Sequence, residues 1–111
     1  MKKSEIKFLV SLDKDNIPEK IEWNAEDSSN NKLSDTKAIS LSLWDDNKKN
    51  TPSINLWTKK MKTDDMKKFY VDCIGGLSQS ILNSTGDEFM SKETNILCEK
   101  LIDYLKNNSD K

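Results

Sequence analysis

The spacing of apolar residues changes once along this chain of 111 residues, and the change constrains the fold more than any other feature. Up to residue 57, most apolar side chains alternate with polar ones, which is typical of half-buried β-strands. From residue 66 onward they recur at intervals of three and four, which is typical of one face of an α-helix. Strands grouped before helices predict an α+β fold.

Four β-strands are predicted from the alternating part of the chain. The apolar residues that define them, strand by strand, are Ile6, Phe8, Val10 and Leu12; Ile21 and Trp23; Ile39, Leu41 and Leu43; and Ile54 and Leu56. The polar cluster at residues 13–16 predicts a turn between the first two strands, whereas residues 24–36 predict an exposed loop. The prediction is a four-stranded antiparallel sheet with one face open to solvent or to a partner.

Two α-helices are predicted from the second part of the chain. The first has Thr63 as its N-cap and stops at Gly86. The second is capped by Ser91, and the tail at about residues 107–111 is expected to fray. Their apolar residues are Met66, Phe69, Tyr70, Cys73, Ile74, Leu77 and Ile81 in the first, and Leu97, Leu101, Ile102 and Leu105 in the second. Both helices are predicted to pack on one face of the sheet, so that residues 1–111 form a single domain.

Two adjacent glycines, Gly75 and Gly76, lie inside the first predicted helix. Each costs about 1 kcal/mol relative to Ala in a helix interior. The pair therefore predicts a close approach of the helix to the sheet, or a kink. It does not predict a phosphate-binding loop, because no Lys followed by Ser or Thr stands at the required spacing.

The residue types present exclude several kinds of function. The sequence contains no His and no Arg, which removes the commonest general base and the usual side chain for bidentate phosphate recognition. A net charge of −1 argues against a surface that binds nucleic acid. Paired carboxylates such as Asp45 and Asp46 lack the glycine of a calcium-binding loop and are interpreted as turn residues. We therefore expect no enzymatic activity, no cofactor and no bound metal.

Cys73 and Cys98 lie on or beside the apolar stripes of the two predicted helices. A nucleophilic Cys usually needs a His partner, so we interpret both as reduced thiols, buried where the helices pack. No apolar segment follows the first lysines, and no stretch of about 18 apolar residues occurs. These features predict a cytoplasmic protein without a transmembrane segment.

The tryptophans differ in their phase relative to the apolar residues of their strands. Trp23 shares the parity of Ile21 and is predicted to lie in the core. Trp44 and Trp57 are out of phase and are predicted to lie on the sheet face opposite the helices. The same face is predicted to carry Ser40, Ser42 and Asn55. Because Trp is enriched at interface hot spots, this face is the candidate binding site. Alternatively, the loop at residues 24–36 covers it, or the alternation ends at the strand ends.

Five short blocks of sequence carry further information. They are Lys2-Lys3-Ser4-Glu5-Ile6-Lys7-Phe8, Pro18-Glu19-Lys20-Ile21-Glu22-Trp23, Leu43-Trp44-Asp45, Leu56-Trp57-Thr58-Lys59 with Met61, and Asp65-Met66-Lys67-Lys68-Phe69. They keep this order and span about residues 2–70. Together they resemble the GldC family of gliding-motility proteins of Bacteroidetes, and the C-terminal helix is similar in type and length.

The resemblance implies a small, non-enzymatic accessory protein of the gliding-motility and secretion machinery, with no catalytic residues to assign. Together with the face of Trp44 and Trp57, it favours contacts with a protein of that machinery or with a second copy of the chain. The alternative is a small carrier of an apolar ligand or lipid, bound between sheet and helices. The residues predicted to line that pocket are Phe8, Trp23, Phe69 and Leu77, with room made by Gly75 and Gly76.

Overall fold

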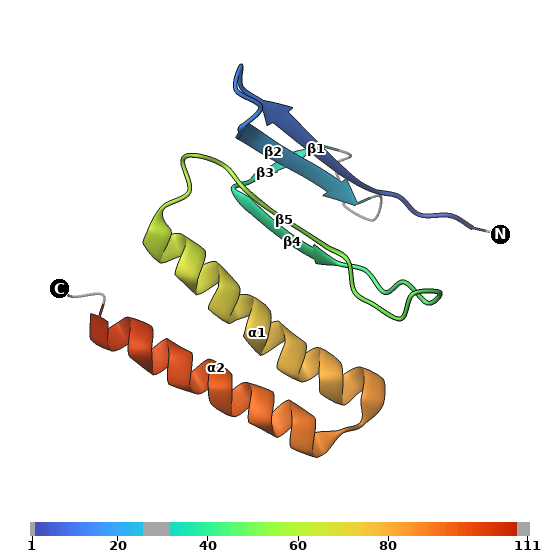
Figure 1. Ribbon diagram of the computed structural model, residues 1–111, viewed down its shortest axis with the longest axis vertical. Coiled ribbons are helices and arrows are strands. Elements are labelled where there is room, and N and C mark those ends of the chain that lie inside the picture. Colours follow the sequence, from blue (N-terminus) through green and yellow to red (C-terminus); the bar gives the residue numbers. More distant parts are fainter. Residues whose placement is uncertain (1, 26–31, 109–111) are drawn as a thin grey trace. The chain divides into compact units, whose positions relative to one another are not determined.

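The computed structural model describes residues 2–25 and 32–108, which form two compact units. The first unit ends at Met61 and contains the strands, and the second begins at Lys62 and contains the helices (Figure 1). Strands precede helices, as the apolar spacing predicts, and the α+β class is confirmed. The assembly of residues 1–111 into a single domain stays a prediction.

Strands β1 (Ile6–Leu12) and β2 (Pro18–Ala25) form the predicted antiparallel hairpin. Phe8 lies directly opposite Trp23 in this register, so the alternating apolar residues of both strands share one face. Ile21 on that face is fully buried. Trp23 lies on the same face, but its side chain stays exposed and is not the core residue that its parity predicts.

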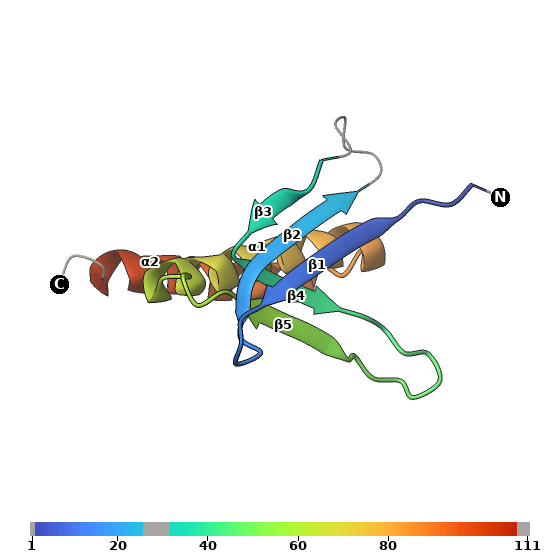
Figure 2. The same ribbon diagram turned by 90° about the horizontal axis from the view of Figure 1, so that it is seen from above.

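The remaining strands do not join that hairpin in one sheet. β3 (Ser34–Thr36) pairs with β2, whereas β4 (Ala38–Ser42) and β5 (Ser53–Trp57) pair with each other. Figure 2 shows the three-stranded sheet, in the order β1-β2-β3, and the separate β4-β5 pair. The prediction of a single four-stranded sheet is therefore wrong, although its antiparallel pairing is confirmed.

A bend at Lys37 separates β3 from β4 and explains why there are two sheets. The Thr36 hydroxyl donates a hydrogen bond to the Ala38 carbonyl (3.0 Å), and the Thr58 amide donates one to the Lys37 carbonyl (2.9 Å). These bonds hold the corner, so the segment before it pairs with β2 and the segment after it pairs with β5. A period of two in apolar residues gives no signal for such a corner.

The polar loop predicted between the second and third strands is shorter in the structure than in the prediction. The loop predicted at residues 24–36 loses both ends, because β2 continues through Ala25 and β3 occupies Ser34–Thr36 with polar residues only. Residues 26–31 of that loop lie outside the described residues, as do residues 109–111 of the predicted tail.

An ion pair connects the turn of the first hairpin to the chain after β5. Lys59 Nζ donates a hydrogen bond to Asp13 Oδ2 at 2.9 Å. Asp13 Oδ1 accepts the amides of Asp15 (2.8 Å) and Ile17 (3.1 Å), which closes the turn. The Lys59 amide also donates to the Pro18 carbonyl (3.3 Å), so main-chain and side-chain bonds both join the two sheets.

The second unit is a hairpin of two helices, α1 (Thr63–Thr85) and α2 (Glu88–Asn108), which run antiparallel (Figure 1). Gly86 ends α1 in the left-handed conformation (φ 72°), and its amide donates to the Leu82 carbonyl at 3.0 Å. The predicted helix stop is therefore confirmed.

Both predicted N-caps are wrong. The N-cap of α1 is Lys62, one residue before Thr63, and its side chain makes no capping hydrogen bond. Asp87 Oδ1 accepts the Met90 amide at 2.9 Å and so caps the first turn of α2. Ser91 lies inside α2 and is buried.

Small side chains form the seam between α1 and α2. The Ser78 hydroxyl donates to the Ser91 carbonyl (2.9 Å), and the Ser91 hydroxyl donates to the Ser78 carbonyl (2.8 Å). The Cys98 thiol donates to the Val71 carbonyl (3.5 Å), and a Cβ added to Gly75 would lie 3.3 Å from that sulfur. Gly75 thus permits a close approach to α2, whereas the glycine pair predicts one to the sheet, or a kink.

The two cysteines have different surroundings. Both thiols are free, and Cys98 is buried in the seam, as predicted. Cys73 is only half-buried, because it lies on another side of α1 than the seam residues.

Replacing Gly76 by Ala is expected to raise the free energy of unfolding by about 1 kcal/mol, because Ala is the better helix former. Apart from its chain neighbours and the nearby backbone of α1, no described atom lies within 4 Å of the added Cβ. Gly75→Ala is the matched control. There the contact of the added Cβ with Cys98 Sγ at 3.3 Å should reduce or reverse the gain in the free energy of unfolding. Urea denaturation of both variants measures the difference. Equal gains at the two positions would contradict the close approach at Gly75.

Replacing Thr58 by Val is expected to raise the free energy of unfolding by about 1 kcal/mol. Thr58 is 4% exposed, and its hydroxyl is the described buried side-chain group without a hydrogen-bond partner. Thr36→Val removes a hydroxyl that does donate a hydrogen bond, to the Ala38 carbonyl. This substitution is expected to lower the free energy of unfolding by about 1 kcal/mol. Thermal or urea denaturation of both variants checks these signs, and a loss at Thr58 as large as that at Thr36 would refute the interpretation.

The Asp13 carboxylate is expected to make the stability of the first unit depend on pH. The hydrogen bond from Lys59, followed by the amides of Ile17 and Asp15, holds the pKa of Asp13 below its usual value. Its contribution is therefore present above the ordinary pKa of about 4 and is lost as the pH falls through the lowered value.

Comparison of the native chain with Asp13→Asn measures this contribution, because Asn can still accept the turn amides. The difference in free energy of unfolding should be largest near neutral pH and should shrink toward about pH 3. A difference that stays constant across this range would show that the carboxylate is not linked to folding.

Candidate interaction site on the β4–β5 hairpin

The register of β4 and β5 determines which of the predicted site residues share a face. Ser40 lies directly opposite Asn55, and Trp57 lies opposite Ala38. Opposite residues of an antiparallel pair point to the same side, as do alternate residues of one strand. Ser40, Ser42, Asn55 and Trp57 therefore share one side of this two-stranded sheet, together with Ser53.

The apolar residues of the same hairpin lie on its other side. They are Ile39 and Leu41 in β4, and Ile54 and Leu56 in β5. Three of these side chains are half-buried, and Ile54 is exposed. The sequence shows these apolar residues out of phase with Trp57. In the structure they lie on one face of the hairpin, and Trp57 lies with the polar residues on the other.

Side-chain hydrogen bonds order the polar part of the face. The Ser40 hydroxyl donates to Asn55 Oδ1 at 2.8 Å, and Asn55 Nδ2 donates to the Ser53 hydroxyl at 3.2 Å. The amide of Asn55 is thereby oriented, while all three side chains remain exposed. They form a polar strip that can exchange hydrogen bonds with a partner.

Trp44 lies beyond the end of β4, at the turn that joins the two strands. The Leu43 amide donates to the Pro52 carbonyl and the Asp45 amide to the Asn50 carbonyl (both 2.9 Å), which continues the strand register past the end of β4. Trp44 therefore keeps the side of Ser42, and its side chain is 62% exposed.

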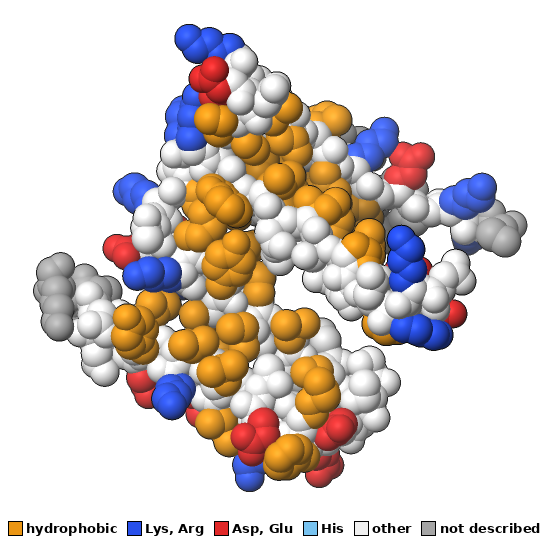
Figure 3. Space-filling model, viewed as in Figure 1, with side chains coloured by type: hydrophobic (Ala, Val, Ile, Leu, Met, Phe, Trp, Pro, Cys, Tyr) orange, Lys and Arg blue, Asp and Glu red, His pale blue; other side chains and the backbone are white. Residues whose placement is uncertain are grey.

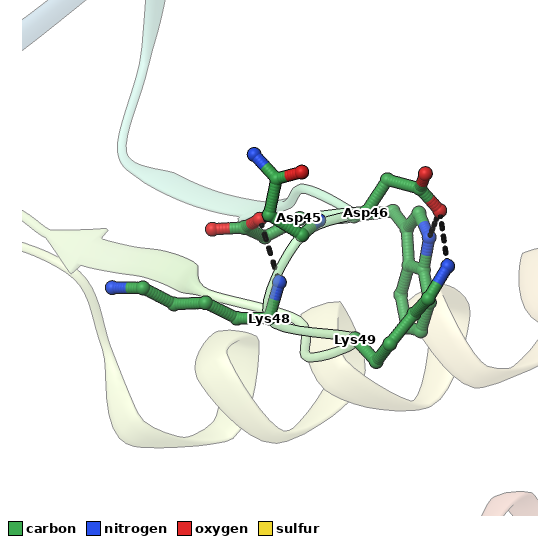
Figure 4. A network of polar contacts seen from close by, with 6 residues as sticks. Asp45, Asp46, Lys48 and Lys49 are labelled. Atoms are coloured by element: carbon green, nitrogen blue, oxygen red, sulfur yellow. Dashed lines mark hydrogen bonds and ion pairs between the residues drawn. The ribbon is translucent and has the colours of Figure 1, made fainter.

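A polar network holds this turn and orients the indole ring (Figure 4). Asp46 Oδ1 accepts hydrogen bonds from Lys49 Nζ (2.8 Å) and from Trp44 Nε1 (3.3 Å). Lys49, and then Trp44, hold the pKa of Asp46 below its usual value. Asp45 Oδ1 accepts the amides of Asn47 and Lys48 (3.0 and 3.2 Å), which confirms the interpretation of Asp45 as a turn residue.

The two tryptophans do not form one cluster. Trp57 lies opposite Ala38, and Trp44 lies six positions further along the same strand direction. At roughly 3.3 Å per residue, their backbones are about 20 Å apart. The candidate site is therefore an extended surface with an aromatic anchor at each end. We call it the hairpin face and define it as Ser40, Ser42, Trp44, Ser53, Asn55 and Trp57.

Sequence reasoning missed the contribution of Asp46 and Lys49 to this site. It predicts only a polar turn at these positions. The available signal is the order Trp44-Asp45-Asp46, in which a carboxylate two residues after an indole can accept its N–H. Ser53 was also missed, because it begins β5 before the first apolar residue of that strand.

A groove of about 470 Å³ lies in the helical unit, near the start of α1 and the end of α2. Val71, Ile102, Tyr104 and Leu105 provide its apolar lining, and charged residues such as Asp64 and Lys67 surround them. Neither Phe69 nor Leu77 lines it, so it is not the pocket that the carrier alternative predicts.

The described residues contain neither a cluster of metal ligands nor a membrane-spanning helix. No group of three or more His, Cys, Asp and Glu in the described part of the chain could hold a metal ion. None of the described helices is long and apolar enough to cross a membrane.

Comparison with known proteins identifies the family. The comparisons with curated proteins and with solved structures give no match. A family model described as gliding motility-associated protein GldC-like matches residues 18–107, which include the hairpin face, all of α1 and α2 up to residue 107. The chain therefore belongs to the GldC-like family of gliding motility-associated proteins.

Proposed function

We propose that this protein is a non-enzymatic accessory component of the gliding-motility machinery, which acts in the cytoplasm through protein–protein contacts of its hairpin face. Membership of the GldC-like family supports the association with gliding motility. The choice of the hairpin face as the contact surface depends on one observation. Trp44 (62%) and Trp57 (50%) are exposed on the same side of a small sheet.

Exposed tryptophans have an energetic cost in the free protein that binding can remove. About half of each side chain, on the order of 100 Å², is in contact with water. At about 25 cal/mol per Å², burial of that area contributes roughly 2–3 kcal/mol for each tryptophan. This magnitude is that of an interface hot spot.

The polar strip between the two anchors supports the same function. Ser40, Ser53 and Asn55 are linked by hydrogen bonds to one another, so their orientation is set before a partner arrives. Ordering in the free protein lowers the entropy lost on binding. Asp46, which is itself bonded to Lys49, orients the Trp44 ring in the free protein by accepting its N–H.

The clearly shifted pKa values of the described residues belong to ion pairs at exposed turns. The described groups whose pKa is clearly shifted are Asp13, Asp46 and Lys59. The main cause in each case is an ion pair at an exposed turn, between Asp13 and Lys59 or between Asp46 and Lys49. Catalytic groups are instead typically perturbed by burial in a cleft.

A Trp44→Ala, Trp57→Ala double variant is expected to abolish gliding when it replaces the native protein in the producing cell. It should also lose at least about 90% of the motility components that co-purify with the native protein, since each truncated anchor costs about 2 kcal/mol or more. Gliding assays and quantitative co-purification at native expression levels measure both effects.

Leu43→Ala is the matched control, because Leu43 is an exposed apolar residue of the same hairpin, next to Trp44 and of opposite parity. It should leave gliding and co-purification unchanged. A double variant that folds, as judged by circular dichroism, and keeps every association would contradict the proposed function.

A further inference from the structure

The main-chain hydrogen bonds between β4 and β5 use every second residue of each strand. The register of the pair is continuous from Ala38 opposite Trp57 to Ser42 opposite Ser53. The bonds that fix the alternation run from the Thr58 amide to the Lys37 carbonyl, from the Leu43 amide to the Pro52 carbonyl, and from the Asp45 amide to the Asn50 carbonyl (each 2.9 Å). Because hydrogen-bonded and non-hydrogen-bonded pairs alternate in an antiparallel ladder, the odd-numbered residues of β4 bond to β5.

The even-numbered residues of β4 therefore direct their N–H and C=O groups away from β5. The carbonyl of Ala38 accepts the Thr36 hydroxyl, so the free row begins at Ser40 and continues through Ser42 to Trp44. Within residues 2–25 and 32–108, no further strand pairs with β4 and no other main-chain hydrogen bond engages these three residues. All three are exposed. We call the outward main-chain groups of Ser40, Ser42 and Trp44 the β4 edge.

The opposite edge of the same sheet offers a shorter row. By the same alternation, the outward groups of β5 are those of Ser53, Asn55 and Trp57. The chain contacts β2 at the end of β5, where the Lys59 amide donates to the Pro18 carbonyl. A strand added along β5 would meet β2 at this end, so the β4 edge is the longer free row.

The β4 edge lacks the features that normally keep other strands away from a sheet edge. Such features are charged side chains, prolines and β-bulges. β1, the outer strand of the first sheet, contains Lys7 and has a register shift between Ser11 and Leu12, and Figure 3 shows hydrophobic side chains gathered over that hairpin. From residue 38 to residue 44 there is no charged residue, no Pro and no register shift. The β4 edge is therefore suited to the addition of a strand.

The geometry of the β4 edge determines the kind of partner that fits it. A chain that bonds to every second residue must itself be extended, and a neighbouring strand places its side chains on the same two faces as β4. A matching segment therefore alternates, with polar residues on the hairpin face and apolar residues on the side of Ile39 and Leu41. β5, on the other side of β4, is a strand of this kind, because its polar residues share the hairpin face and its apolar residues lie with Ile39 and Leu41.

We propose that the protein partner of the hairpin face supplies an extended segment of alternating polar and apolar residues, which adds to the β4 edge as a third strand. Main-chain hydrogen bonds then provide affinity, and side chains beside Ser40, Ser42 and Trp44 provide specificity. The added strand also converts a marginal two-stranded sheet into a three-stranded one. This inference rests on the proposed function, because the same partner contacts the hairpin face.

The first measurement is amide hydrogen exchange of the free full-length protein, resolved by residue with NMR. The amides of Ser40, Ser42 and Trp44 should exchange at least about 10-fold faster than those of Leu41 and Leu43, which bond to β5. Slow exchange of the three outward amides would show that another part of the chain covers the β4 edge, and it would overturn the proposal.

The second measurement repeats the exchange in a complex. The probe is the motility component that co-purifies in the largest amount with the native chain, added as a separately purified protein. The amides of Ser40, Ser42 and Trp44 should become at least about 10-fold slower. If they stay fast in a complex that the double tryptophan variant cannot form, the proposed function stands and the proposal for the β4 edge is overturned. The tryptophans thus test the hairpin face, and the amides test the edge.

Ser40→Pro removes one outward N–H, which an edge strand tolerates because β5 does not use it. Ser40→Ala is the matched comparison, because both variants lose the hydroxyl that donates to Asn55 and only Pro loses the N–H. Ser40→Pro should raise the dissociation constant of the complex at least about 10-fold more than Ser40→Ala does. Ser42→Pro and Ser42→Ala repeat the comparison should Ser40→Pro lose its native circular dichroism.

Equal losses in the Pro and Ala variants would overturn the proposal, because the main chain would then contribute nothing to binding. Asn55→Pro and Asn55→Ala apply the same comparison to the outward N–H of β5. These two should differ from each other by less than about 3-fold, since the partner strand lies on the other edge. A large difference at Asn55 and none at Ser40 would overturn the choice of β4.

Discussion

The bend at Lys37 is the constraint on which the candidate site depends. It takes the chain out of the sheet of β1, β2 and β3 and starts a second sheet, so that β4 and β5 pair only with each other. A two-stranded sheet has two open faces and two open edges, and it is marginal on its own. The hydrogen bonds at Thr36 and Thr58, and the Asp13–Lys59 ion pair, anchor it to the first hairpin. These bonds act at the end of the β4–β5 sheet that is opposite its turn. The hairpin face can therefore stay exposed without loss of the sheet.

Four of the five strands were predictable from the sequence, whereas β3 and the arrangement of the strands were not. Alternation at Phe8, Ile21, Leu41 and Leu56 depends on local chain geometry, and each of these residues lies in a strand. The corner depends on which carbonyl the Thr36 hydroxyl and the Thr58 amide reach, and the second of these bonds joins residues far apart in the chain. The predicted phase of Trp57 within its strand is correct although the predicted single sheet is wrong. The phase is a property of each strand and not of the sheet that the strand joins.

The helices show a related limit of sequence reasoning. The strongest period in α1 comes from its large residues, Met66, Tyr70 and Leu77, and it predicts a helix correctly. The seam with α2 lies one residue further on, at small residues such as Gly75 and Ser78, which contribute little to an apolar pattern. Close packing of two helices favours small residues, whereas burial against a broad surface favours large ones. The predicted apolar stripe is therefore the face that remains after the hairpin has formed.

Few apolar side chains of the described residues are buried, so binding to a partner can add substantially to the stability of the fold. Among the described residues, the buried hydrophobic side chains are Ile21, Ala38, Val71 and Cys98, and only Ile21 is both large and fully buried. Exposed apolar side chains, including Trp44 and Trp57 of the hairpin face, therefore contribute little to folding while they are in contact with water. A partner that binds only the folded form adds its binding free energy to stability, about 2.7 kcal/mol at a hundred times its dissociation constant. For a chain with so small a core, a partner bound at the hairpin face would also stabilise the fold, so the abundance of the protein would follow that of its complex.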